Sequence, residues 1–208
     1  MPAALRERLR EAARRRGFAR NPNTMEAALA RCAARGPGIR TVIDVGASDG
    51  RWSRAASRIL PPARFFMVEA RAEHEPGLAR TARDARFSYE ICAAGDRDGE
   101  IYFDARDLFG GLAGPYAIKL DTHGYEVPIL EGAAALLAQS TLLVIECYNF
   151  RVAPRSLLAH EMCAWLEARG FRCIDLCDPL HRASDGALWQ MDLFFVPATD
   201  PAFARNAF

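Results

Sequence analysis

Four polar side chains in the middle of the chain have types and spacings that can support proton transfer. Lys119 and Asp121 lie two residues apart in the segment AIKLD, so both point to one face of a strand. His123 follows in the turn DTHGYE, where an imidazole can act as a general base near neutral pH. Glu146 ends the apolar run LLVIE. Lys119, Asp121, His123 and Glu146 are therefore the candidate catalytic residues, although a solvated loop histidine is an equal alternative for His123.

Lys119 is the only lysine among the 27 lysine and arginine residues of the sequence. An ammonium in a central strand is costly unless it is paired, and both Asp121 and Glu146 are candidates for the opposite charge. Because arginine serves everywhere else, this position needs a compact head group that a guanidinium cannot replace. Two interpretations stay open: a buried ion pair that fits only lysine, or a lysine that acts in catalysis or orients a substrate.

The same region offers oxygen ligands of the kind that Mg²⁺ prefers, on Asp121, Glu146 and Asn149. We expect no metal there, because Lys119 already supplies positive charge nearby. The six cysteines include no CxxC pair, and several fall inside apolar runs, so we expect reduced and mostly buried thiols.

The segment DVGASDG, which follows an apolar run, is a candidate cofactor loop. Gly46 and Gly50 permit a tight turn and close approach of the backbone to a ligand. The spacing is not the G-x-G-x-x-G of dinucleotide dehydrogenases. Asp44 would repel a pyrophosphate but suits a cationic ligand, such as the ammonium and sulfonium of S-adenosylmethionine (SAM). The alternative is a strand–turn–helix junction with a capping aspartate.

A second acid follows at a suitable distance. Glu69 ends RFFMVE, 25 residues after Asp44, close to the spacing expected for a carboxylate that accepts ribose hydroxyls. Small residues in AAGD can flank a flat adenine. The predicted cofactor-binding residues are Asp44, Gly46, Ala47, Ser48, Gly50, Glu69, Ala70, Ala93, Ala94 and Asp121.

Alternating strand and helix patterns must position these residues. We expect strands at 40–46, 64–70, 87–94, 116–121, 141–149, 171–177 and 188–197, with helices at 51–60, 73–84, 126–139 and 154–170. A hairpin arm is expected at 95–103, and helices at about 3–19 and 24–35. The pattern predicts an α/β fold: a doubly wound, mostly parallel sheet with an antiparallel last strand. We divide the chain into an N-terminal helical extension, 1–36, and one domain, 37–208.

Bulk properties limit the partners. The 208 residues carry a formal net charge of +1, so nothing global points to nucleic acid or an anionic membrane. No apolar run approaches the length of a transmembrane helix. We expect a cytoplasmic protein with a small-molecule or glycan acceptor and without a membrane or nucleic-acid partner, and leave a homodimer open. Residues 1–20 carry seven arginines against two glutamates, which suits a surface helix better than a nucleic-acid arm.

Several of these segments together resemble a known family. VIDVGASDGRWS, FFMVEA, AAGDRDGEIYF, IKLDTHGYEVPILEGA, LLVIE and LWQMDLFFV occur in the order seen in FkbM-type SAM-dependent methyltransferases. The resemblance covers roughly residues 40–197 and is most specific from Lys119 to Gly132. It implies a Rossmann-like methyltransferase fold, with SAM over DVGASDG and Glu69, and methyl transfer to a hydroxyl.

Two departures from the family's pattern bear on the acceptor. The stretch between GEIYF and the strand at 116–121 is short and lacks the family's Thr-x-Leu-Asp element. His123 stands where the family commonly has Glu or Gln. Two other functions are considered. A catalytically silent SAM-binding or scaffolding domain is disfavoured by the intact acids at the strand ends. An RNA ribose 2′-O-methyltransferase is disfavoured because its Lys-Asp-Lys-Glu set needs two lysines.

Overall fold

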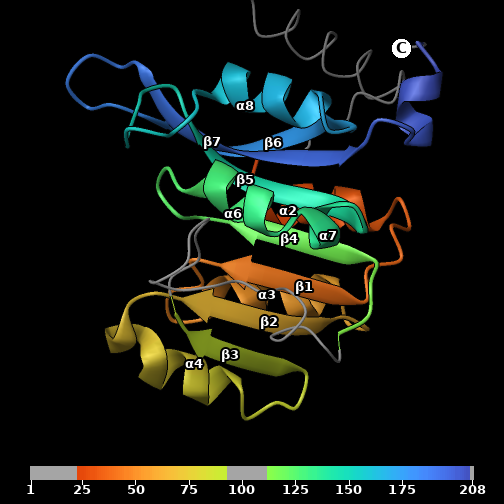
Figure 1. The fold of residues 1–208 in the computed structure, drawn as a ribbon, viewed down its shortest axis with the longest axis vertical. Helices are drawn as coiled ribbons and strands as arrows, with labels where there is room; N and C mark the ends of the chain where they lie inside the picture. The colour runs from red at the N-terminus through yellow and green to blue at the C-terminus, as the bar shows by residue number, and fades with distance from the viewer. Residues whose placement is uncertain (1–22, 93–111, 207–208) are drawn as a thin grey trace, which may run out of the picture.

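In the computed structural model, which describes residues 23–92 and 112–206, a seven-stranded sheet forms the centre of the molecule (Figure 1). Its strand order is β3-β2-β1-β4-β5-β7-β6, and β7 alone runs antiparallel to its neighbours. The expected doubly wound sheet with an antiparallel last strand is therefore confirmed. The strands are β1 (Thr41–Val45), β2 (Arg64–Glu69), β3 (Phe87–Ile91), β4 (Tyr116–Leu120), β5 (Ser140–Tyr148), β6 (Phe171–His181) and β7 (Leu188–Pro197).

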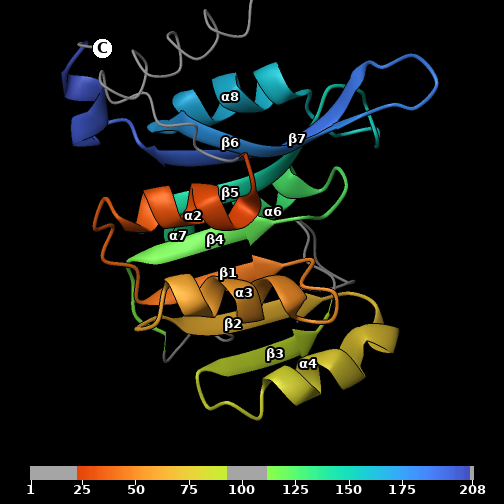
Figure 2. The same cartoon turned by 180° about the vertical axis from the view of Figure 1, so that it is seen from behind.

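Helices cover both faces of this sheet. Figure 1 shows one face, with α6 (Glu126–Gly132), α7 (Ala134–Leu137) and α8 (Ala159–Glu167). Figure 2 shows the other, with α2 (Met25–Ala33) and α3 (Arg51–Ile59), while α4 (Glu75–Thr81) lies beside β3. Two short 3₁₀ turns, η1 (Ala72–His74) and η2 (Pro201–Ala204), complete the described elements. None of the described helices has both the length and the apolar character needed to cross a bilayer.

The four central strands β2, β1, β4 and β5 form where the sequence is apolar and β-branched, because they are buried on both faces, whereas the edge strands β3 and β6 are partly exposed. β1 and β4 are buried at every position, and they lie side by side in the middle of the sheet. One core packs under α6, α7 and α8 and includes Ile118 and Leu120 of β4. The other packs under α2 and α3 and includes Ala117 of the same strand. Lys119 therefore points to the α2–α3 face.

Two expected helices differ in their bounds. The predicted helix 126–139 is divided into α6 and α7, because Ala133 between them has a non-helical backbone. α8 begins at Ala159 rather than at 154: Leu158 is extended, and the Glu161 carboxylate caps its N–H. The expected helix at 3–19 and the hairpin arm at 95–103 lie outside the described residues.

All six cysteines are free thiols. Cys32, Cys147 and Cys177 are buried, Cys92 and Cys163 are half-buried, and Cys173 is exposed. Cys173 lies on β6, the edge strand of the sheet, most of whose residues are exposed or half-buried.

Candidate active site

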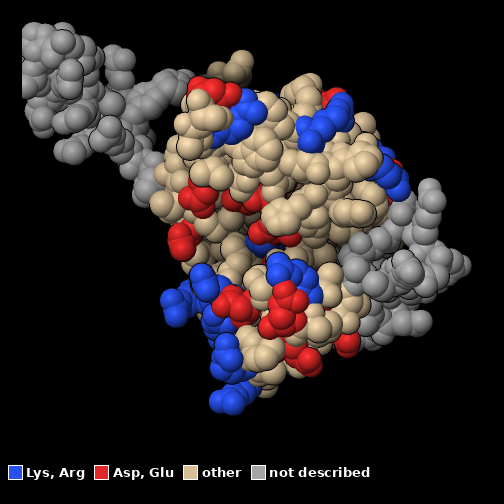
Figure 3. All heavy atoms as spheres, turned by 90° about the vertical axis from the view of Figure 1, so that its left-hand side faces the viewer, with Lys and Arg blue, Asp and Glu red and all other residues tan. Residues whose placement is uncertain are grey.

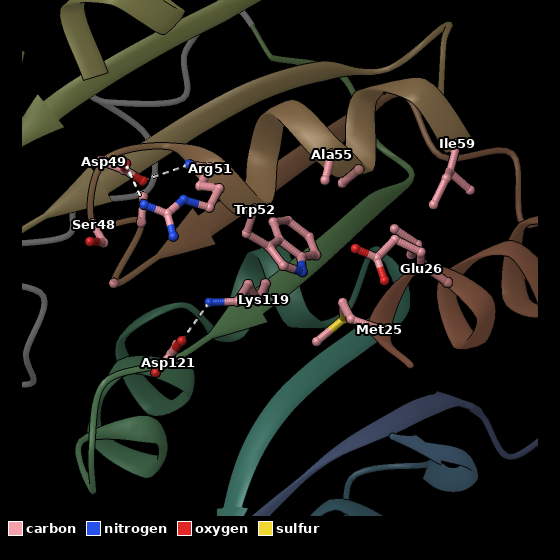
Figure 4. Close-up of a pocket in the computed structure, with 14 residues that line it drawn as sticks. Met25, Glu26, Ser48, Asp49, Arg51, Trp52, Ala55, Ile59, Lys119 and Asp121 are labelled. Atoms are coloured by element: carbon pink, nitrogen blue, oxygen red, sulfur yellow. Dashed lines mark hydrogen bonds and ion pairs between the residues drawn. The ribbon is translucent and has the colours of Figure 1, made fainter. Parts of the chain in front are cut away.

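A cavity of about 380 Å³ opens where β1 and β4 end. Figure 3 looks onto this edge of the sheet, where acidic side chains gather around a hollow near the middle of the face. Figure 4 shows its walls: the loop after β1, the facing sides of α2 and α3, and the end of β4. Of the predicted cofactor residues, Gly46, Ala47, Ser48 and Asp121 line it, together with the predicted catalytic Lys119.

The loop after β1 approaches β4 so closely that it requires glycine. Gly46 has a φ of 78°, and a Cβ built there would lie 2.0 Å from the backbone oxygen of Asp121. Gly50 has a φ of 76°, and a Cβ there would lie 2.9 Å from Thr81 Oγ1. Gly50 also caps α3, so the loop passes straight into that helix. The backbone of the predicted cofactor loop therefore lies directly against the start of the turn that carries His123.

Lys119 is 4% exposed and holds two carboxylates together. Its Nζ lies 3.0 Å from Asp121 Oδ2 and 3.6 Å from Asp44 Oδ1. Burial by itself lowers the pKa of Lys119, but the two carboxylates outweigh it and the pKa is raised. The ammonium is therefore charged at neutral pH. The expected partnership with Asp121 is present, whereas Asp44 rather than Glu146 supplies the second opposite charge.

Asp44 lies behind Lys119 rather than in the cavity wall. It is fully buried on β1, directly opposite Lys119 in the parallel register, and Ser53 of α3 donates to its Oδ2 at 2.6 Å. Burial raises the pKa of Asp44, although Lys119 and Ser53 both favour the charged form. Among the described residues no hydrogen bond reaches its Oδ1. Asp44 would therefore affect a ligand in the cavity only indirectly, by holding the Lys119 ammonium in place.

Glu69 is tied to the same loop from the β2 side. Its Oε2 accepts the backbone N–H of Ser48 at 2.7 Å, and its Oε1 accepts that of Arg71 at 2.9 Å. Each carboxylate oxygen keeps a further lone pair for a ligand hydroxyl. Glu69 does not line the cavity itself, and Ala70 beside it is exposed. The predicted Ala93 and Ala94 fall outside the described residues.

Trp52 of α3 is a cavity residue that the sequence analysis did not identify. Its ring lies 5.5 Å from Lys119 Nζ, a cation–π contact, and it faces Met25 and Glu26 of α2 across the cavity. Its buried Nε1 has no hydrogen-bond partner within residues 23–92 and 112–206. An unpaired buried donor is costly, so this N–H is suited to an acceptor on a bound molecule. The sequence could have indicated Trp52 as a cavity residue, because it lies at the start of α3, directly after the glycine loop.

His123 occupies the turn after β4 in a strained conformation. Its φ is 53°, which is uncommon for a residue with a side chain. The turn is fixed by buried Glu126, whose Oε1 accepts from Thr122 Oγ1 and from the Gly124 N–H, both at 3.0 Å. The His123 side chain is 72% exposed, and its Nδ1 points back toward the protein. Non-glycine residues with positive φ are found in turns, where histidine is one of the side chains that tolerate it, and they cluster at functional sites.

Glu146 holds that imidazole. His123 Nδ1 lies 3.1 Å from Glu146 Oε2, 2.7 Å from the Tyr148 hydroxyl and 3.9 Å from Asp121 Oδ1. The structure thus brings together all four predicted catalytic residues: Lys119 contacts Asp121, and Asp121 adjoins the pair of His123 and Glu146. Burial raises the pKa of Glu146, while its hydrogen bond from Tyr148 favours the charged form.

A further acid, Asp192, lies beside this group. It is opposite Glu146 in the antiparallel pairing of β5 with β7. Burial raises the pKa of Asp192 to about 7, against the opposing effect of Lys119. Sequence reasoning missed this residue, because only the strand pairing places it next to Glu146. Asp192 adds to the negative charge at this edge of the sheet.

Two groups of side chains in the described segments could each enclose a cation: Asp121 with His123 and Glu146, and Cys177 with Asp178 and Asp192. The first shares two residues with the Mg²⁺ alternative weighed from the sequence. Glu146 is already engaged there by His123 and Tyr148, so the absence of a metal stays our prediction.

The profile described as Methyltransferase FkbM domain matches residues 102–173, a range that contains Lys119, Asp121, His123 and Glu146. This match is shorter than the expected 40–197 and omits the loop at 44–50. A search of curated protein sequences returned no match.

Solved structures with the same fold are numerous. Magnesium protoporphyrin IX methyltransferase from Synechocystis PCC 6803, solved with bound SAM, is 12% identical, with a TM-score of 0.53 over 83% of this chain and 77% of that one. An O-methyltransferase family protein from Burkholderia thailandensis is 14% identical, with a TM-score of 0.53 over 84% and 55%. A candidate RNA methyltransferase from Pyrococcus horikoshii is 14% identical, with a TM-score of 0.52 over 85% and 83%.

At these identities the solved structures show the fold alone. Together with the sequence match, they identify a chain with the Rossmann-like fold of methyltransferases whose residues 102–173 match the FkbM methyltransferase domain.

Proposed function

We propose that this protein is a SAM-dependent O-methyltransferase that acts on a hydroxyl group of a small molecule or glycan. The observation that carries the proposal is that the cavity beside the glycine loop adjoins the pair of His123 and Glu146. Asp121 lines the cavity beside the glycine loop, and its Oδ1 lies 3.9 Å from His123 Nδ1, which Glu146 supports. A candidate base therefore adjoins a candidate cofactor pocket.

The residues of the cavity fit SAM by their chemistry. Gly46 lets the loop pass directly against the backbone of Asp121, so the loop and the end of β4 form adjoining walls of the cavity in which the cofactor would lie. Glu69 lies outside the cavity lining, but it holds Ser48 of the lining loop and keeps acceptor capacity for ribose hydroxyls. The unpaired N–H of Trp52 would suit the carboxylate at the amino-acid end of the cofactor. When bound, SAM supplies an electrophilic methyl group on a positively charged sulfur.

The protein's own contribution would be alignment and proton removal. Holding an acceptor oxygen in line can supply roughly 7–11 kcal/mol of the barrier reduction, and a base adds about 10²–10⁴-fold. Asp121 is engaged by Lys119 through its Oδ2, so it is a positioned anion rather than the best base. His123 is more exposed and is backed by a buried carboxylate, which stabilises the imidazolium that forms when it takes a proton.

The alternative functions remain disfavoured on physical grounds. A silent SAM-binding scaffold would have no use for the strained, carboxylate-supported His123. An RNA ribose 2′-O-methyltransferase would need a second lysine, and the acids around the hollow would repel phosphates. An NAD-dependent dehydrogenase does not fit the glycine spacing.

Cofactor binding is tested first by thermal denaturation with SAM, its demethylated product S-adenosylhomocysteine, and NAD as control. A ligand at 100 times its Kd adds about 2.7 kcal/mol, which corresponds to roughly 5–11 °C for a domain of this size. We expect that shift with both sulfur compounds and none with NAD. If neither sulfur compound raises the melting temperature, the cofactor assignment is wrong.

Activity is tested by transfer of a labelled methyl group from SAM to a panel of sugars, glycosides and phenols, with single-stranded RNA as the competing acceptor class. The key variant is His123→Asn, because asparagine tolerates the positive φ that alanine does not. We expect turnover to fall about 10²–10⁴-fold with an unchanged Kd for SAM. Unchanged turnover would remove His123 from the mechanism, and labelling of RNA alone would replace the proposed acceptor class.

A further inference from the structure

The Glu146 carboxylate has a hydrogen-bond partner at each of its two oxygens. Its side chain is 10% exposed. The Tyr148 hydroxyl donates to Oε2, and Gln190 Nε2 donates to Oε1. Tyr148 lies two residues further along β5, and Gln190 is its partner in the antiparallel pairing with β7. Neither residue was identified from the sequence, because only the pairing of β5 with β7 brings them around one carboxylate.

The protons in this group can be assigned atom by atom. A carboxylate only accepts, and a tyrosine hydroxyl has one proton to give. Burial raises the pKa of Tyr148, and the Glu146 carboxylate raises it further, so the hydroxyl keeps its proton and donates it to Glu146. His123 Nδ1 faces the Tyr148 oxygen at 2.7 Å and Glu146 Oε2 at 3.1 Å. Both oxygens can then only accept from Nδ1.

We propose that Tyr148 and Gln190 are positioning residues that orient Glu146, so that neutral His123 carries its proton on Nδ1 and presents an unprotonated Nε2 as the proton acceptor. The tautomer follows from the hydrogen bonds around an ionised Glu146, whereas its use in proton removal rests on the proposed methyl transfer. The His123 side chain is 72% exposed, so little packing fixes its ring orientation. The hydrogen bonds at Nδ1 therefore have to fix both the orientation and the tautomer.

Each partner has a distinct effect in this arrangement. Without the Tyr148 hydroxyl, Nδ1 loses its nearer acceptor and Glu146 loses the donor that fixes Oε2. Without the Gln190 amide, the carboxylate can rotate about its last bond, because Oε1 is no longer fixed. A Glu146→Gln change would offer Nδ1 an N–H donor in place of an acceptor, which favours the opposite tautomer.

The test is long-range ¹H–¹⁵N NMR of protein labelled with ¹⁵N-histidine, recorded at a pH where imidazole rings are neutral. The ¹⁵N shifts of the two ring nitrogens report which one carries the proton. His123→Asn assigns the signal, and His74, His160 and His181 serve as internal references in each spectrum. No cofactor or acceptor is needed, so the result is separate from the cofactor-binding and methyl-transfer tests of the proposed function.

We expect the Nδ1–H form for His123 in the wild type. In Tyr148→Phe and Gln190→Met, the ring should move toward the Nε2–H form that untethered histidines favour, and in Glu146→Gln it should adopt that form. Tyr89→Phe is the matched control, since Tyr89 donates to Glu75 away from this group. A wild-type Nε2–H ring, or an unchanged Nδ1–H ring in a folded Tyr148→Phe protein, would overturn the proposal. If Tyr148→Phe does not fold, Gln190→Met decides by the same criterion.

Discussion

Replacing Lys119 with methionine removes the ammonium from the middle of the sheet while keeping an unbranched side chain of similar length. Lys119 Nζ lies 3.6 Å from Asp44 Oδ1, and Asp44 is fully buried. Methionine therefore leaves a buried carboxylate without its cation. Removing one partner of a buried ion pair costs about 3–5 kcal/mol. At roughly 2–4 °C per kcal/mol for a chain of this size, the melting temperature should fall by roughly 6–20 °C.

The pH dependence of this loss identifies its cause. Burial already raises the pKa of Asp44, and Lys119 opposes that rise, so the variant's Asp44 pKa must be higher still. An acid whose pKa is higher in the folded than in the unfolded state loses stability as pH rises between the two values. The deficit of Lys119→Met should therefore be small near pH 4 and full near pH 8.

The assay is urea denaturation of the wild type and Lys119→Met at both pH values. The double variant Lys119→Met with Asp44→Asn is the control, because it removes the stranded charge while the amide oxygen introduced at position 44 can still accept from Ser53. It should regain at least about 2 kcal/mol at pH 8, since a neutral pair avoids the cost of an uncompensated charge. A deficit under about 1 kcal/mol, or one that is equal at both pH values and persists in the double variant, would refute this reasoning.

Three further predictions concern the loop, the ribose acid and the second buried carboxylate. Gly46→Ala should destabilise the fold by more than about 3 kcal/mol in urea denaturation, through its collision with Asp121. Gly36→Ala, with a φ of 72° and nothing within 4 Å of its Cβ in the described part of the chain, should cost only about 1–2 kcal/mol; equal losses would contradict the steric argument. Glu69→Gln should weaken SAM binding by about 1.5–3 kcal/mol in calorimetry, because it removes a charged acceptor for the ribose hydroxyls. Glu73→Gln is the control and should leave SAM binding unchanged, because Glu73 is exposed and pairs with Arg71. Similar affinities of the two variants would exclude the ribose role. Asp192→Asn should flatten the pH dependence of stability between about pH 4 and 7, because the raised folded pKa of Asp192 makes the wild type lose up to about 4 kcal/mol across that window; parallel curves would show that Asp192 does not titrate as inferred.

The fold could be predicted because its central strands are short apolar runs separated by clear helix and turn signals, whereas β6, which continues to His181 beyond the predicted 177, is mixed in polarity. The same topology explains why Asp121 and the glycine loop meet: parallel strands end at one edge of the sheet. The division of the helix at 126–139 was not predictable, since the backbone of Ala133 follows from packing rather than from propensity.

The partners within the site depend on strand order. Asp44 and Lys119 are 75 residues apart in sequence, and only the adjacency of β1 and β4 places them opposite each other. For the same reason Glu146, expected as a partner of Lys119, instead holds His123 and is itself held from β7 by Gln190. Spacing along one strand predicts which side chains share a face, but not which neighbouring strand supplies the opposite charge.

The single lysine gives the protein a built-in chemical reporter. Apart from the α-amine, Lys119 offers the chain's only amine to acylating reagents, and it is 4% exposed and held in its protonated form. Its modification rate therefore measures how often the cavity opens and the ion pairs separate. Mass spectrometry can follow that rate at one residue, so protection by any molecule bound in the cavity can be read directly.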